Sequence, residues 1–353
     1  MTSMVSPQAY LEYLRKLART SHDAWWLVSE RTGTEESRRA KLRATLRFFG
    51  QEHQAAALES RLDKELPASD LSPDLRDVVE QTVRDLEDYL LPDELPDFRR
   101  TVFGLLPLSG ADAFCTDRTL ERVRLDGYLV ILNEGIFVCA QLLAKAFLLA
   151  NLDGDLLQYR RSGTDVHHAA ISHLLAPASA HANRIFFDAV PPDIEGALAA
   201  AQMNMTILLL QFVLLHEMGH VVHGDHSLMG EYRFHIAAAS EPSPSPTEKF
   251  WAAEHSADEY ALDRILRRAG ADTSRWANFV AIYVFFHWLD AAERVAKHQL
   301  CPLHPPPLAR GEALRKLMLE RVPLDGQTKQ LVDKSFDILG TWGASVVQGE
   351  SAP

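Results

Sequence analysis

Hydrophobic residues along this chain recur mostly at helical spacing, and strand-like patterning is confined to one short stretch. Residues 8–100 have apolar positions three and four residues apart without a clear strand, which predicts a set of amphipathic helices. The apolar run over residues 197–215 is too long for a strand and predicts a buried helix, and the Ala- and Leu-rich residues 251–263 predict another. Residues 127–133 read as a strand that leads into a helix over about 134–150. The pattern therefore predicts an α+β fold, mainly α with a small β-sheet.

A motif with metal-binding chemistry closes the long apolar run. Residues 216–220 read HEMGH. Positions four apart share one face of a helix, so the imidazoles of His216 and His220 point toward one spot, and Glu217 lies beside it. This HExxH pattern is typical of a zinc site that carries its own general base. We therefore expect Zn²⁺ as the cofactor, His216 and His220 as two of its ligands, and Glu217 as a catalytic residue.

A catalytic zinc takes three protein ligands and keeps one open position, so a third ligand must come from elsewhere in the chain. Glu254 and Asp258 lie four residues apart on a predicted helix, where one carboxylate can bind the metal while the other accepts the ring N–H of a histidine ligand. His226 is the alternative, because it stands where the HExxHxxGxxH pattern of the metzincins has its third histidine. That pattern has glycine where this chain has His223, and the glycine comes one residue later. Glu254 is the favoured ligand, with Asp258 behind it.

Several motifs in a fixed order resemble those of the gluzincin peptidases of the CaaX-prenyl-protease and bacterial heat-shock membrane protease type. They are HExxH at 216–220, ExxAD at 254–258 and a Leu-His-Pro segment at 303–310, preceded by a hairpin-like pattern within 112–135. The resemblance implies a zincin-like metallopeptidase domain that cleaves a protein or peptide substrate. In the third motif, His304 corresponds to the family's histidine, and Arg310 to an arginine one turn later that we expect to orient this segment.

The expected reaction is hydrolysis of a peptide bond by a zinc-activated water. Glu217 would take the proton of this water and return it to the leaving amine. His304 is the expected second catalytic residue, as a donor to the oxyanion, with Tyr260 as the alternative. By resemblance, His304 could instead fill the open metal position in a latent state. The strand at 127–133 is either a sheet edge that takes up the substrate as an added strand or an ordinary buried strand.

The motifs divide the chain into an N-terminal helical region, residues 1–100, and a zincin-like metallopeptidase domain, residues 101–353. Prolines interrupt the helical pattern, so residues 91–107 are expected to form a connector between the two. Within the larger part, residues 151–196 form an insertion that we cannot place in the family pattern. Residues 237–249 form a loop rich in proline and serine.

Composition narrows the function classes further. The net charge of −12 argues against a nucleic-acid partner, because such partners are bound largely through Lys and Arg. The chain has only 3 cysteines and its first residues lack a secretory signal, so a cytoplasmic location is expected. Polar residues interrupt the long apolar runs, so membrane association stays open but is not favoured.

Three function classes therefore remain. The favoured one is a cytoplasmic zinc metalloendopeptidase, and the second is an integral membrane protease of the same chemistry. The third is a non-catalytic, zinc-stabilised binding or sensor protein. Glu217 argues against this class, because a structural zinc site needs no general base. The sequence leaves the substrate and the oligomeric state open.

Overall fold

A computed structural model of the protein describes most of the elements expected from the sequence. The described residues are 4–19, 73–106, 113–119, 123–151, 197–225, 247–296 and 304–348. The helices are α1 (Pro7–Arg19), α5 (Pro73–Leu86), the short η3 (Glu87–Tyr89), α6 (Leu95–Arg99), α7 (Glu134–Asn151), α10 (Ala197–His223), α12 (Thr247–Arg268), α13 (Asp272–Ala296), α14 (Pro307–Arg321) and α15 (Gly326–Gln348). The strands are β1 (Thr101–Leu106), β2 (Ala113–Arg118) and β3 (Arg124–Asn133). The predicted fold class, mainly α with a small β-sheet, is confirmed.

The three strands form one mixed sheet in the order β1-β3-β2. β3 pairs in parallel with β1 and antiparallel with β2, so the predicted strand at 127–133 lies in the middle of the sheet. The hypothesis that this strand is a sheet edge for the substrate is therefore wrong, because both of its backbone edges are already bonded to neighbouring strands. The expected connector at 91–107 also needs correction, since it contains α6 and β1.

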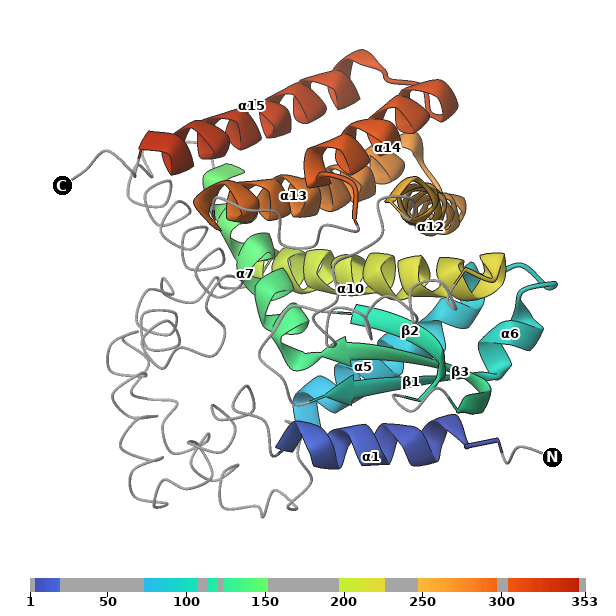
Figure 1. The fold of residues 1–353 in the computed structure, drawn as a ribbon. Helices are drawn as coiled ribbons and strands as arrows, with labels where there is room; N and C mark the ends of the chain where they lie inside the picture. Colours follow the sequence, from blue (N-terminus) through green and yellow to red (C-terminus); the bar gives the residue numbers. More distant parts are fainter. Residues whose placement is uncertain are drawn as a thin grey trace, which may run out of the picture.

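β3 is apolar along most of its length because both of its faces are buried. Leu129 and Ile131 lie on the face covered by α1, in a core cluster with Leu11 of that helix. Val130 and Leu132 point to the opposite face and belong to the main core. This arrangement follows from the alternation of side chains along a strand. Figure 1 shows the result: α1 lies on one side of the sheet and α10 on the other.

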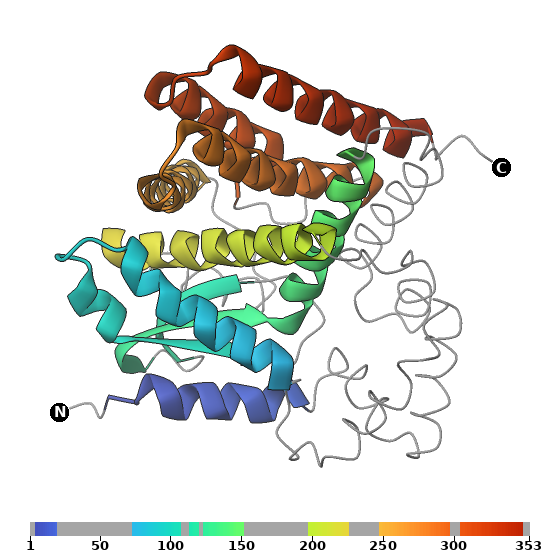
Figure 2. The ribbon, with the colours of Figure 1, turned by 180° about the vertical axis from the view of Figure 1, so that it is seen from behind.

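The helix α10 runs through the middle of the molecule. It contacts the sheet on one side and α12 and α13 on the other, and α7 crosses it (Figure 1). The helix α5 also packs against α10, as the view from behind shows (Figure 2). Val79 and Leu86 of α5 belong to the same core cluster as the C-terminal helices, so the N-terminal helical residues contribute to the core that holds α10.

One helix segment within the described residues, Ala200–His223, is long and apolar enough to cross a membrane. Its most apolar window is 83% buried inside the protein. Because the core helix of a soluble protein meets the same criteria, this is only a weak indication of a membrane span.

Some of the expected features lie outside the described residues. They include His226, nearly all of the 151–196 insertion, and residues 237–246 of the Pro/Ser-rich loop. The last three residues of that loop, 247–249, form the first turn of α12.

Candidate metal centre

The HExxH motif forms the last turns of α10, where this helix crosses α12 at close range. Gly219 makes the approach possible, because a Cβ atom at this position would lie 3.0 Å from the Cα atom of Ala257 and 3.2 Å from the ring of Tyr260. Ala257 is itself fully buried and presents only a methyl group. Two small residues therefore bring the backbones of the two helices together, and this places Glu254 of α12 over the histidines of α10.

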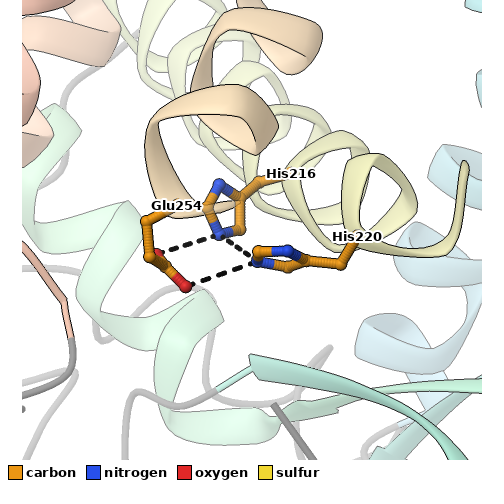
Figure 3. Close-up of side chains that lie close together, drawn as sticks. All are labelled: His216, His220 and Glu254. Atoms are coloured by element: carbon orange, nitrogen blue, oxygen red, sulfur yellow. Dashed lines mark hydrogen bonds and ion pairs between the residues drawn. The ribbon is translucent and has the colours of Figure 1, made fainter. Parts of the chain in front are cut away.

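His216, His220 and Glu254 converge on one point (Figure 3). The Nε2 atoms of the two histidines lie 3.2 Å apart. Each Nε2 atom lies 3.4 Å from an oxygen of Glu254, His216 from Oε2 and His220 from Oε1. All three side chains are buried. The ligand atoms lie within 4.8 Å of one another, so the group can hold a metal ion.

The hydrogen-bonding roles of the atoms fit a cation at this point. Nδ1 of His220 lies 2.8 Å from Oδ1 of Asp225, and Nδ1 of His216 lies 2.9 Å from Oδ1 of Asp258. A carboxylate next to each Nδ1 favours the tautomer with the proton there, so that each Nε2 presents a lone pair. Neither buried oxygen of Glu254 accepts a hydrogen bond within the described part of the chain. Two nitrogen lone pairs and a carboxylate thus face one another, which is the donor set of a metal site.

Two side chains from the C-terminal part complete the surroundings of this group. Arg310 of α14 donates two hydrogen bonds of 2.7 Å to the carboxylate of Asp258. Its Nη1 lies 3.2 Å from Oε2 of Glu254, so one guanidinium holds both carboxylates of the ExxAD motif. His304 lies just before α14, with Nε2 3.4 Å from Oε1 of Glu254. The described part of the Leu-His-Pro segment, residues 304–310, therefore lies beside the candidate metal site.

The pKa values of His220 and Glu254 are shifted because several ionisable side chains lie close together in the buried site. Burial alone would lower the pKa of His220, but the hydrogen bond to Asp225 and the charge of Glu254 outweigh it and raise the pKa to about 10. Burial would raise the pKa of Glu254, but the positive charges of His304 and Arg310 hold it well below its usual range. The carboxylate of Glu254 is thus ionised at neutral pH, and the imidazole of His220 next to it favours the protonated, positively charged form.

One residue of the site, Asp225, was not predicted from the sequence. Gly224, at φ +74°, ends α10 in the left-handed region, which glycine adopts without steric cost. The N–H of Gly224 donates to the carbonyl of Val221 and the N–H of Asp225 donates to the carbonyl of His220. This pair of bonds is a Schellman motif, and it turns Asp225 back toward His220. The signal in the sequence is the Gly-Asp pair directly after the helix.

The remaining candidates differ in where they lie. Glu217 is buried on α10, next to the first histidine. The ring of Tyr260 packs edge-on against His223 and beneath the guanidinium of Arg264, so its described contacts are with the α10–α12 crossing. His226 lies outside the described residues.

Comparison with known proteins adds one finding. Residues 180–321 match the Peptidase U49 family. The matched range contains α10, α12, α13 and α14, and with them every candidate site residue. This similarity to a peptidase family supports a peptidase function and therefore a protein or peptide substrate. No curated protein and no solved structure matches the chain.

Proposed function

We propose that this protein is a zinc-dependent metalloendopeptidase of the gluzincin type. The observation that carries the proposal is the buried convergence of His216, His220 and Glu254, within 4.8 Å of one another, in a segment similar to a peptidase family. Two imidazoles and one carboxylate are the ligand set that catalytic zinc takes in this type of enzyme, with a fourth position left for water. The described group supplies three ligands and no fourth.

The proposed chemistry combines a metal held by this group with Glu217 of the HExxH motif. A bound Zn²⁺ would polarise the substrate carbonyl and make a water molecule acidic enough to react near neutral pH. Glu217 would accept a proton from the water that attacks the carbonyl carbon of the scissile peptide bond. As the C–N bond breaks, Glu217 would return that proton to the leaving amine.

The oxyanion that develops on the carbonyl needs a hydrogen-bond donor. His304 is our candidate for this role, because it lies 3.4 Å from Glu254 at the edge of the ligand group and is the most exposed of the histidines there. Arg310 holds Asp258 and Glu254 in place and thereby positions the metal ligands. Tyr260 is the weaker donor candidate, since its described contacts are with the helix crossing.

Support for a gluzincin rather than a metzincin arrangement comes from the length of α10. The helix continues to His223, three residues past the second histidine, and ends at Gly224. The metzincin pattern requires glycine in place of His223, so that the chain can turn toward a third histidine. Here Glu254 already lies at the site, where Arg310 forms an ion pair with it, and Asp258 faces His216.

The direct test is the substitution Glu217→Gln in the full chain. It removes the proposed base but no ligand, so we expect zinc content to stay near one equivalent while peptidase activity falls by at least about 10²-fold. Glu248→Gln, on the exposed first turn of α12, is the matched control and should keep both. Activity is measured on an unfolded protein substrate, and zinc by elemental analysis. Full activity of Glu217→Gln would contradict the assignment of Glu217 as the base of this site. A wild-type protein that binds zinc but cleaves nothing would favour the zinc-stabilised binding protein instead.

A further inference from the structure

The two histidines of the candidate site are held by different carboxylates. His216 faces Asp258, which receives two hydrogen bonds from Arg310 and is fully buried. His220 faces Asp225 at 2.8 Å, from a residue that follows α10 rather than from the ExxAD helix. The two ligands are thus oriented independently, one across the helix crossing and the other from the end of its own helix.

The backbone places Asp225 in this position. The helix α10 ends in a Schellman motif in which the N–H of Asp225 donates to the carbonyl of His220. This hydrogen bond fixes the backbone of Asp225 relative to that of His220. Gly224 supplies the left-handed conformation that this turn needs, at φ +74°. A residue in this turn can direct a short side chain back to the imidazole one turn earlier, and aspartate has the length that reaches Nδ1.

We propose that Asp225 is a positioning residue for the second histidine ligand, fixing the ring of His220 with its Nε2 lone pair toward the metal. The inference rests on the proposed zinc site. A carboxylate on Nδ1 stops the ring from flipping and removes the tautomer that would place a proton on Nε2. It also makes Nε2 a stronger donor to a cation. Loss of such a partner typically weakens metal binding by about 10- to 100-fold.

The test compares zinc affinities of the full-length protein and its variants by competition with a chromogenic chelator. Asp225→Ala should bind zinc about 10- to 100-fold more weakly than wild type. Asp225→Asn should fall in between, because its amide oxygen still accepts the Nδ1 proton but carries no charge. Asp333→Ala, an exposed aspartate on α15 paired only with Lys329 among the described residues, is the matched control and should bind zinc like wild type.

A second measurement separates positioning from a merely structural role. The visible absorption of bound Co²⁺ reports the geometry of its ligands, so it should change in Asp225→Ala and move back toward wild type in Asp225→Asn. If Asp225 only ended the helix, its backbone N–H would do so in either variant, and both zinc affinity and the Co²⁺ spectrum would stay as in wild type. That result overturns the inference.

His220→Ala keeps the inference distinguishable from the proposed function. If His220→Ala loses zinc while Asp225→Ala binds it like wild type, only the positioning role fails. If wild type itself takes up no zinc, the metal site fails, and the role of Asp225 with it. Asp225→Asn preserves the size of the side chain, so it decides the question even if the alanine variant does not fold.

Discussion

Two histidines four residues apart on a helix do not define a metal site until something fixes which nitrogen carries the proton. In this protein each ring has its own carboxylate on Nδ1, Asp258 for His216 and Asp225 for His220. The Nε2 atoms consequently meet at 3.2 Å over Glu254. In the metal-free protein a proton on His220 offsets the charge of Glu254, and a metal ion would take the place of that proton. At the residue scale, the proposed function therefore depends on the carboxylates as much as on the histidines.

The raised pKa of His220 leads to a prediction about protons. With a pKa of about 10, this imidazole is protonated at pH 7.5 when no metal is bound, and a metal must displace that proton to reach Nε2. We expect zinc binding to release about one proton or more, measured by titration calorimetry in buffers of different ionisation enthalpy. Affinity should fall as the pH is lowered. Zinc binding without proton release at pH 7.5 would contradict a protonated His220 in the metal-free protein.

The same shift has a consequence for the metal-free protein. Because the pKa of His220 is raised above its unfolded value of about 6.5, the protonated ring contributes stability that is complete below that pH. This contribution is lost as the pH rises toward about 10. Bound zinc would replace the proton, so the melting temperature should depend less on pH in this range when zinc is present.

At the scale of elements, the crossing of α10 and α12 determines whether the third ligand reaches the histidines. We predict that Gly219→Ala weakens zinc binding, although alanine is the better helix former by about 1 kcal/mol. Its methyl group would lie 3.0 Å from the Cα atom of Ala257, so the helices must separate by a few tenths of an ångström and carry Glu254 away from the histidines.

The matched control for this crossing is Gly326→Ala at the start of α15, where a Cβ atom meets nothing within 4 Å. It should leave zinc affinity unchanged, as measured by the same chelator competition. If Gly219→Ala binds zinc as tightly as wild type, the close approach of the two helices is not what positions Glu254.

The main helices were predictable from the sequence, and the sheet was predictable only in part. Long apolar or alanine-rich runs in the sequence indicate the helices α7, α10 and α12. The residue ranges predicted for these helices lie almost entirely within the observed ones. The strand at 127–133 was found as well, and the hairpin-like pattern within 112–135 matches the antiparallel pair of β2 and β3. The parallel pairing with β1, which places β3 in the middle of the sheet, was not predicted. β1 was missed because it is short and follows directly after a proline-containing turn of helix.

The candidate site was predicted to the extent that its residues share a helix face or a known motif. Glu254 and Asp258 could be named because four-residue spacing brings both carboxylates to one side of a helix. Asp225 could not be named in this way, because its place depends on how α10 ends. The glycine before it was noticed only as a departure from the metzincin pattern, whereas in the structure it forms the turn that returns Asp225 to His220.

At the scale of the whole molecule, contacts far apart in the sequence hold the metal-binding helices. Glu94, just before α6, forms a buried ion pair with Arg264 of α12. The guanidinium of Arg264 in turn lies 4.5 Å from the ring centroid of Tyr260, which fills the space beside Gly219. The residues before the sheet are thus connected to the crossing that positions the ligands.

The most direct test of the proposed metal site is the zinc content of two purified full-length variants, Glu254→Ala and His226→Ala. In the proposed site the third ligand lies on α12, so Glu254→Ala should retain little zinc and little activity, because two histidines alone hold the metal far more weakly. His226→Ala should keep both. If instead zinc is lost from His226→Ala and kept by Glu254→Ala, the third ligand is a histidine, and the gluzincin assignment is wrong.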